Sequence, residues 1–164
     1  MRDYGKSGAG HGQIVGKEAV MTKTPPPENY RPYEGNDGGF ATHVGPLYVD
    51  ERQMLSPRFA FLPGTHHANH AGVVHGGMLM TLSDQILGLT VRANAGTHAV
   101  VTVSLTCQFV TAARPGHWIE GWAEIIHRAG KLFFIRGTLV SGGVPVMTSN
   151  GIWKQVREPK QGKH

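Results

Sequence analysis

Hydrophobic and polar positions change their spacing along the chain, and these changes predict one helix and several strands. Residues 76–95 form a long apolar segment without proline, rich in Leu and Met, and its length favours a helix over a strand. Apolar residues fall on nearly every side of this helix, so we expect it to be buried almost all round. Gly96 follows as a C-terminal stop signal.

After the helix, the pattern changes to the two-residue period of β-structure. Residues 98–110 alternate strictly and predict a strand with two distinct faces. Its apolar face consists of Val101, Val103, Leu105, Cys107 and Phe109, and its polar face of Thr102, Ser104, Thr106 and Gln108. Turn sequences separate the other predicted strands, which are residues 45–49 and 58–62 before the helix and residues 117–127, 131–141 and 144–156 after it.

Three glycines, Gly121, Gly137 and Gly151, lie near the middle of the last three predicted strands. Glycine weakens a strand interior, and its presence there often marks a close approach of another part of the chain. A helix lying across the sheet would account for all three. The sequence therefore predicts an α+β fold in which a curved antiparallel sheet wraps around one long central helix.

The first part of the chain differs from the rest. Residues 1–41 are rich in Gly, contain consecutive prolines and hold few large apolar residues, which is typical of a flexible arm. We expect this arm to dock on the domain in part through Tyr30 and Tyr33. The other two predicted segments are a folded domain at residues 42–156 and a basic tail at residues 157–164.

Composition and charge exclude several classes of function. The net charge of +5 is spread along the chain without a basic cluster, so we expect no nucleic-acid partner, whereas a small ligand with phosphate groups would fit. The single Cys, Cys107, excludes a disulfide scaffold and falls among apolar core positions. No apolar stretch suits a membrane span and the first residues lack a signal-peptide core, so we expect a cytoplasmic protein without a membrane partner.

The 11 acidic residues are unevenly placed, and one of them is isolated. Asp84 is the only carboxylate between Arg52 and Ile119, and it falls within the predicted apolar helix. A buried carboxylate without a partner is costly, so its presence there indicates a function as a general base or nucleophile. The alternative is an aspartate on the helix surface with a local partner.

A second candidate lies at the start of the same helix, in His75-Gly76-Gly77. Backbone N–H groups at a helix N-terminus have no partner within the helix, and the helix dipole favours negative charge there. They could therefore stabilise the oxyanion that forms when a carbonyl is attacked. The alternative is a junction that needs glycine for its conformation, with His75 as a simple cap.

Helix geometry separates these two candidates. Gly76 and Asp84 are eight residues apart, which is about 12 Å along the helix axis. One carbonyl group cannot contact both within a single chain. If both act on the same bond, the site must combine Gly76 of one chain with Asp84 of another, and the sequence then predicts a homodimer.

The residues around these candidates resemble a known family. Hot-dog-fold acyl-CoA thioesterases of the phenylacetate-degradation (PaaI-like) type have a motif similar to Asn69-His70-Ala71-Gly72-Val73-Val74-His75-Gly76-Gly77 followed by Leu82-Ser83-Asp84, and the resemblance extends over residues 42–156. It implies a hot-dog fold and hydrolysis of an acyl-CoA thioester to a carboxylic acid and free CoA. It further implies active sites at a homodimer interface, dimers that often pair into homotetramers, and no cofactor beyond the coenzyme A of the substrate.

The resemblance also implies roles for individual residues. Asp84 corresponds to the general base or nucleophile, and the amide of Gly76, helped by that of Gly77, to the oxyanion donor. Three further positions correspond to polar groups that orient the carbonyl, the water or the carboxylate: Asn69, His75 and Thr102. The candidate cations for the phosphates of coenzyme A are Arg114, Arg128, Lys131 and Arg136.

Several questions stay open at this level. His66, His67 and His70 lie beside the motif, but no acidic or thiolate ligand is near them in sequence, so we predict no metal site. A hydratase or dehydratase acting on acyl thioesters and a non-catalytic acyl-CoA binder are the alternatives. The Gly-Gly after His75 suits carbonyl polarisation, and a carboxylate in an apolar helix argues against a pure binder. The acyl group and the choice between base and anhydride mechanisms are not determined.

Overall fold

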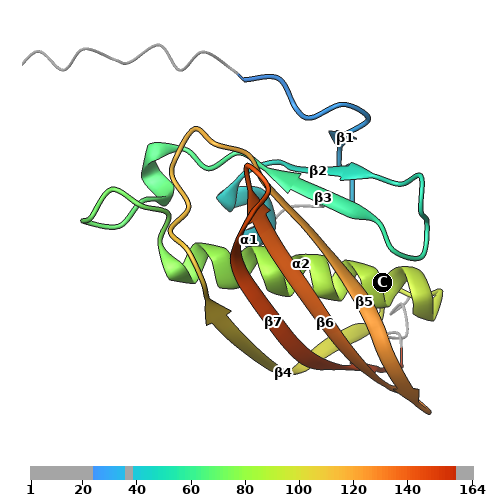
Figure 1. Cartoon of the computed structure of the whole chain (residues 1–164). Coiled ribbons are helices and arrows are strands. Elements are labelled where there is room, and N and C mark those ends of the chain that lie inside the picture. The colour runs from blue at the N-terminus through green and yellow to red at the C-terminus, as the bar shows by residue number, and fades with distance from the viewer. Residues whose placement is uncertain (1–23, 36–38, 158–164) are drawn as a thin grey trace, which may run out of the picture.

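One long helix, α2 (Gly76–Ala95), lies against a curved seven-stranded antiparallel sheet in the computed structural model, which describes residues 24–35 and 39–157 (Figure 1). The strand order is β1-β2-β3-β5-β6-β7-β4. The strands are β1 (Arg31–Pro32), β2 (Leu47–Asp50), β3 (Arg58–Phe61), β4 (Val100–Phe109), β5 (Ile119–Ala129), β6 (Leu132–Ser141) and β7 (Val144–Gln155). The remaining elements are α1 (Gly39–Val44) and a 3-10 turn at Thr65–His67.

The predicted central helix and every predicted strand are present. Helix α2 has the predicted bounds, with His75 as its N-cap and Gly96 in the left-handed conformation at its end (φ 63°). The left-handed region favours glycine, which explains why the helix stops there. The α+β prediction of a curved antiparallel sheet around one long helix is therefore confirmed.

Two elements that the sequence did not predict, β1 and α1, lie in or beside the segment interpreted as an arm. Strand β1 pairs with β2, the Tyr33 ring packs edge-on against Phe59, and the Tyr30 hydroxyl donates to a Glu120 carboxylate oxygen at 3.0 Å. Residues 1–23 of the predicted arm and residues 158–164 of the predicted tail lie outside the described residues.

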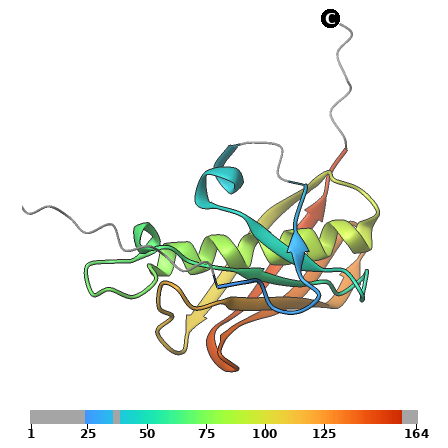
Figure 2. The same ribbon diagram turned by 90° about the horizontal axis from the view of Figure 1, so that it is seen from above.

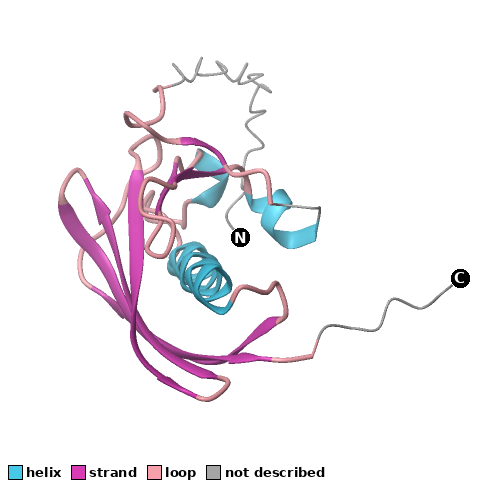
Figure 3. Ribbon diagram, turned by 90° about the vertical axis from the view of Figure 1, so that its right-hand side faces the viewer, coloured by secondary structure: helices cyan, strands magenta, loops and turns pink. Residues whose placement is uncertain are grey.

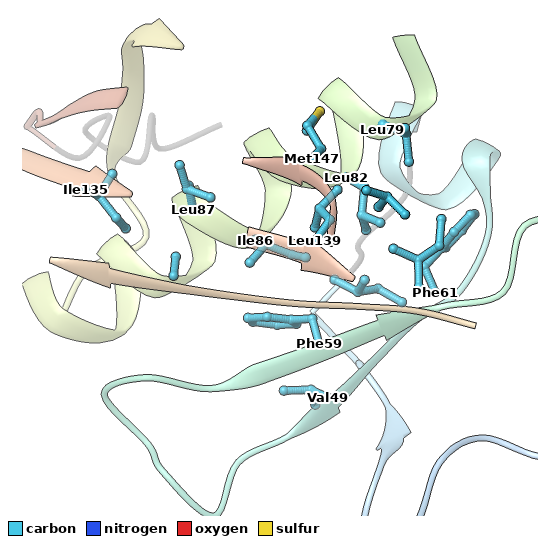
Figure 4. Packing of buried hydrophobic residues seen from close by; sticks show 14 of the residues in the cluster. Val49, Phe59, Phe61, Leu79, Leu82, Ile86, Leu87, Ile135, Leu139 and Met147 are labelled. Atoms are coloured by element: carbon cyan, nitrogen blue, oxygen red, sulfur yellow. The ribbon is translucent and has the colours of Figure 1, made fainter. Parts of the chain in front are cut away.

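The core forms where α2 crosses the sheet, and Figure 4 shows Leu82, Ile86 and Leu87 facing strand residues such as Leu139. A Cβ at Gly121 would lie 2.6 Å from Ile86 Cδ1, and one at Gly137 would collide with Leu87. The prediction that these glycines admit the helix is confirmed. Glycine at position 151 has a different cause, because a Cβ there would meet the Trp153 ring and the Ser104 carbonyl of β4.

The expected all-round burial of α2 is wrong for a single chain. The sheet covers one face of the helix, and the fully buried residues on it include Leu82 and Ile86. Figures 2 and 3 show α1 on the other side of α2 from β5, β6 and β7, and Figure 3 shows no strand crossing the helix between α1 and β4. On this side Met80 is exposed and Asp84 is half-buried. Met78 and Leu89 still pack partly against the core, whereas Met80 has no cover within one chain.

The strict alternation predicted for residues 98–110 is also wrong, because β4 contains a bulge. Thr102 lies opposite Trp153 of β7 and Ser104 opposite Ile152, so Val103 is the extra residue. A bulge reverses the side on which the following residues lie. Thr102 therefore shares the helix-facing side with three residues beyond the bulge, which are Leu105, Cys107 and Phe109, while Val103 is 56% exposed.

Among the described residues, no helix is long and apolar enough to cross a membrane.

Candidate active site

Asp84 lies on the uncovered side of α2, and β4 supplies its partner. The Thr102 hydroxyl donates to Asp84 Oδ1 at 2.8 Å. Within residues 24–35 and 39–157, no cation lies within ion-pair distance of the Asp84 carboxylate. The carboxylate opens into a cavity of about 370 Å³ that Gln85, Gly88 and Trp153 also line. Among the described residues, the Thr102 hydroxyl is therefore the one hydrogen-bond partner of the Asp84 carboxylate, whose other oxygen has no protein partner there.

Cys107 faces the same side of β4 as Thr102 and is half-buried. Burial raises the pKa of the Cys107 thiol, and the nearby charge of Asp84 raises that pKa further. A raised pKa keeps the sulfur protonated at neutral pH. The thiol is therefore a weak nucleophile, in agreement with its interpretation as a small packing residue.

The start of α2 carries one free backbone donor. His75 Nδ1 accepts the Gly77 N–H at 2.9 Å, so the Gly77 amide already has an acceptor. No described group accepts the Gly76 N–H. The histidine is thus the helix cap, and Gly76, rather than Gly77, keeps a donor available for a ligand oxygen at the positive end of the helix dipole.

An apolar cavity of about 360 Å³ adjoins Gly76, and Val74, Leu79 and Phe109 are among its lining residues. The Phe109 ring lies so close to Gly76 that a Cβ there would be 3.2 Å from two ring atoms. Any side chain at position 76 would crowd the approach to the amide. This explains why a glycine occupies the first position of the helix.

The Asn69 side chain organises the loop that leads to Gly76. Its Oδ1 accepts the Ala71 N–H at 2.9 Å and the Val73 N–H at 3.4 Å. The Val74 N–H then donates to the Ala113 carbonyl, which ties this loop to the segment after β4. Asn69 therefore fixes the position of the helix start, and the oxygen of its side-chain amide is occupied.

The histidines beside the motif have structural contacts that the sequence did not reveal. His67 Nδ1 accepts the Gly64 N–H at 2.9 Å, and its Nε2 donates to the Val44 carbonyl at 2.7 Å. Burial lowers the pKa of His67, which favours the neutral ring that this pair of bonds requires. His66 packs against the His67 ring and His70 is exposed. No group of three or more potential metal ligands occurs in the described part of the chain.

The four candidate cations for coenzyme A lie in different places. Arg114 comes directly after Ala113 in the sequence, and Ala113 lines the cavity beside Gly76. Arg128 and Lys131 flank the β5–β6 turn, where Arg128 also stacks on the Phe133 ring at 4.7 Å. Arg136 forms an ion pair with Glu124 at 2.6 Å, so its charge is already matched. A single chain does not gather these cations around one ligand.

The catalytic candidates likewise fall into two half-sites, named here by their central residues. The Asp84 half-site comprises Asp84 and Thr102, and the Gly76 half-site comprises Gly76 and the surrounding loop with His75 and Asn69. They are about 12 Å apart along α2 and lie beside opposite ends of β4. The structure brings Thr102 to Asp84 as expected, and it keeps Gly76 away from both.

Comparison with known proteins extends this description. The Thioesterase superfamily matches residues 71–147. The putative esterase PA0474 of Pseudomonas aeruginosa is 33% identical over 111 residues, which are 67% of this chain and 83% of that protein.

Solved structures share the fold at lower identity. A mutant of the phenylacetic acid degradation protein PaaI from Thermus thermophilus matches with a TM-score of 0.64 and 21% identity, over 71% of this chain and 98% of its own. A hypothetical thioesterase from Streptococcus pneumoniae, solved with coenzyme A, matches with a TM-score of 0.60 and 19% identity, over 66% and 86%. The shared fold and the matching sequence lead to one conclusion: this chain belongs to the Thioesterase superfamily, with a PaaI-like hot-dog fold and the activity of a thioester hydrolase.

Proposed function

We propose that this protein hydrolyses acyl-CoA thioesters to a carboxylic acid and free CoA, in a homodimer whose active sites combine the two half-sites. The environment of the Asp84 carboxylate carries the proposal. The Thr102 hydroxyl donates to it at 2.8 Å, it has no counter-ion among the described residues, and it is open to a cavity. The coenzyme A bound to the structurally similar Streptococcus pneumoniae protein supports coenzyme A as the thiol part of the substrate.

In this proposal the two half-sites act on opposite sides of the reacting bond. The Gly76 N–H donates to the thioester carbonyl oxygen, where negative charge develops, and the helix dipole adds to the stabilisation. Asp84 takes a proton from a water whose oxygen attacks the carbonyl carbon. The tetrahedral intermediate then expels the CoA sulfur as a thiolate, which accepts the proton that Asp84 took from the water and leaves as a thiol. Asn69 and His75 position the Gly76 N–H, Asn69 through its hydrogen bonds to the preceding loop and His75 by capping the helix.

Strand β4 offers the surface on which two chains could meet. It is the edge strand of the sheet, with unpaired backbone groups along one side, and Val101 and Val103 are exposed on it. A two-fold axis at Thr106 would pair each β4 antiparallel with its copy. Because Val103 is bulged, Thr102 would then lie opposite Phe109 of the partner subunit. Asp84 would thereby come to the Gly76 of the partner subunit.

The same pairing accounts for the scattered cations. The β5–β6 turn lies near the start of β4, because the Lys131 carbonyl accepts from Gln155, which pairs with Val100. In the antiparallel pairing, Arg128 and Lys131 would lie near Arg114 of the partner subunit. We propose that these three cations hold the phosphates of coenzyme A at the dimer surface, and that Arg136 contributes less because Glu124 pairs with it.

The Asp84→Asn variant tests the proposal. It should lower kcat for acyl-CoA hydrolysis about 10²–10⁴-fold, because the amide cannot take a proton from water. Release of free thiol from a panel of short, long and aryl acyl-CoA substrates is the measurement, with circular dichroism to verify folding. Glu28→Gln, at an exposed carboxylate away from both half-sites, is the matched control. Unchanged turnover in Asp84→Asn would refute the assignment.

A further inference from the structure

A second, larger cavity continues from the Asp84 half-site along α2. It has a volume of about 570 Å³ and lies between the C-terminal half of the helix and β2 and β3. The two cavities share three lining residues, Tyr33, Leu89 and Arg92. The walls of the larger one are mostly apolar and include Val49, Met54, Pro57 and Phe59. The space beside Asp84 therefore extends toward the end of the helix.

Arg92 lies where the two cavities meet. It follows Asp84 by eight residues on α2, which is about 12 Å along the axis, and it is half-buried. Among the described residues, no carboxylate forms an ion pair with Arg92 and no group accepts a hydrogen bond from its side chain. Glu51, the one carboxylate among the described lining residues of the larger cavity, forms an ion pair with Arg31.

A half-buried guanidinium beside apolar walls is a favourable position for binding an anion. Burial weakens the hydration of the charge, and five N–H donors need acceptors. A carboxylate matches the planar fork of Arg with two parallel hydrogen bonds. Among the described residues, the site therefore offers no anion to Arg92, which lies about 12 Å along α2 from the carboxylate that would activate the water.

We propose that Arg92 binds a carboxylate at the far end of the acyl group, so that the preferred substrates are CoA thioesters of medium-length dicarboxylic acids. This inference rests on the proposed function, because it places the thioester carbonyl at Asp84. The methylene groups run past Leu89 and Val100, which line the path between the two charged side chains. Arg92 is then a specificity-determining residue.

A phosphate of coenzyme A is the other anion that could reach Arg92. The lining of the larger cavity favours the acyl chain, because its apolar walls suit methylene groups and its described lining residues contain no second arginine or lysine. Phosphate groups of a bound cofactor more often meet several cations or helix N-termini.

The test compares dicarboxylyl with monocarboxylyl substrates of equal length. Wild-type protein should hydrolyse adipoyl-CoA with a kcat/KM about tenfold to hundredfold above that for hexanoyl-CoA, since a site that hydrogen-bonds a polar group rejects the analogue without it. Arg92→Met should remove this preference and leave hexanoyl-CoA hydrolysis intact, and Arg92→Lys should retain part of it. Arg157→Met, at an exposed arginine, is the matched control. Glutaryl-CoA and suberoyl-CoA, with pentanoyl-CoA and octanoyl-CoA, define the preferred length.

Other outcomes would overturn the inference. Equal activity of wild-type protein on adipoyl-CoA and hexanoyl-CoA would show that Arg92 does not bind the carboxylate at the far end of the acyl group. An equal loss on both in Arg92→Met, absent when the thiol is N-acetylcysteamine, would assign Arg92 to a coenzyme A phosphate. If no acyl-CoA is hydrolysed at all, the proposed function is wrong, and the role of Arg92 must be tested by binding instead of by activity. Calorimetric titration with adipate and hexanoate then decides the inference, which requires tighter binding of adipate that Arg92→Met abolishes.

Discussion

The two half-sites of this protein differ in the kind of group that each one supplies. At the Gly76 half-site the active group is a backbone N–H, placed by a loop, a histidine cap and a neighbouring aromatic ring. At the Asp84 half-site it is a side chain, placed by one hydroxyl across a bulged strand. In the proposed mechanism, the first donates a hydrogen bond to the developing negative charge and the second accepts a proton.

In the proposed mechanism, this difference means that neither half-site suffices on its own. A donor without a base would bind a thioester and leave it intact, and a base without an oxyanion donor would lack stabilisation of the transition state. Both groups belong to one rigid helix, so a shift within the chain cannot bring them together. In the proposed dimer, association of two chains joins them, and this can be tested directly.

The largest expected effect comes from mixing two inactive variants. Asp84→Asn removes the base, and Gly76→Pro disables the other half-site, because it removes the N–H at the first helical position and its ring crowds the approach beside Phe109. Each homodimer should lose about 10²-fold or more in kcat. A mixed dimer has one site with both groups intact, so random mixing should restore about one quarter of wild-type turnover.

Thiol release after co-refolding or subunit exchange is the measurement for this mixing experiment. Each variant refolded alone is the control. Absence of restored activity, with mixed dimers verified by native mass spectrometry, would mean that each site is built within one chain.

A smaller effect is expected when the support of the base is removed. Thr102→Val deletes the hydroxyl that donates to Asp84 Oδ1. A hydrogen bond to a charged group contributes about 1.5–3 kcal/mol, so kcat should fall about tenfold or more while KM changes little. Thr102→Ser keeps the hydroxyl and should restore most of the rate. Equal losses in both variants would point to packing rather than to this hydrogen bond.

The smallest expected effect on activity comes from a crosslink that tests the strand register of the proposed dimer interface. In a Cys107→Ser background, Thr106→Cys places an exposed thiol at the proposed two-fold axis. Opposite residues of paired strands have Cα atoms about 4.5–5.5 Å apart, within reach of a disulfide. Mild oxidation should give a covalent dimer on a non-reducing gel, with activity retained.

Ser104→Cys in the same background is the matched control for this crosslink, because its thiol faces Gln108 of the partner subunit in the proposed pairing. Efficient crosslinking of Ser104→Cys together with failure of Thr106→Cys would contradict the register.

Much of the fold follows from local pattern. The bounds of α2, the strands and the turns at Gly130 and Gly142-Gly143 are decided by residue types close together in the chain. The glycines at 121 and 137 even indicate where the helix crosses the sheet. The sequence did not predict β1, α1, the contacts of His67 or the bulge at Val103. Strand β1, the His67 contacts and the bulge each depend on a partner that is distant in sequence and that no local signal reveals.

The candidate site shows the same division between the sequence and the tertiary structure. The sequence alone determined which groups are available: one isolated carboxylate, one glycine at a helix start, and a fixed separation between them that the helix rise sets. Only the tertiary structure decided that Gly77 is capped while Gly76 is free, and that a bulge at Val103 turns Thr102 toward Asp84. The sequence of β4 predicts a regular strand because its hydrophobic pattern has a period of two. The extra residue follows from the register of β4 with β7, and this register exists only after the sheet has closed on the helix.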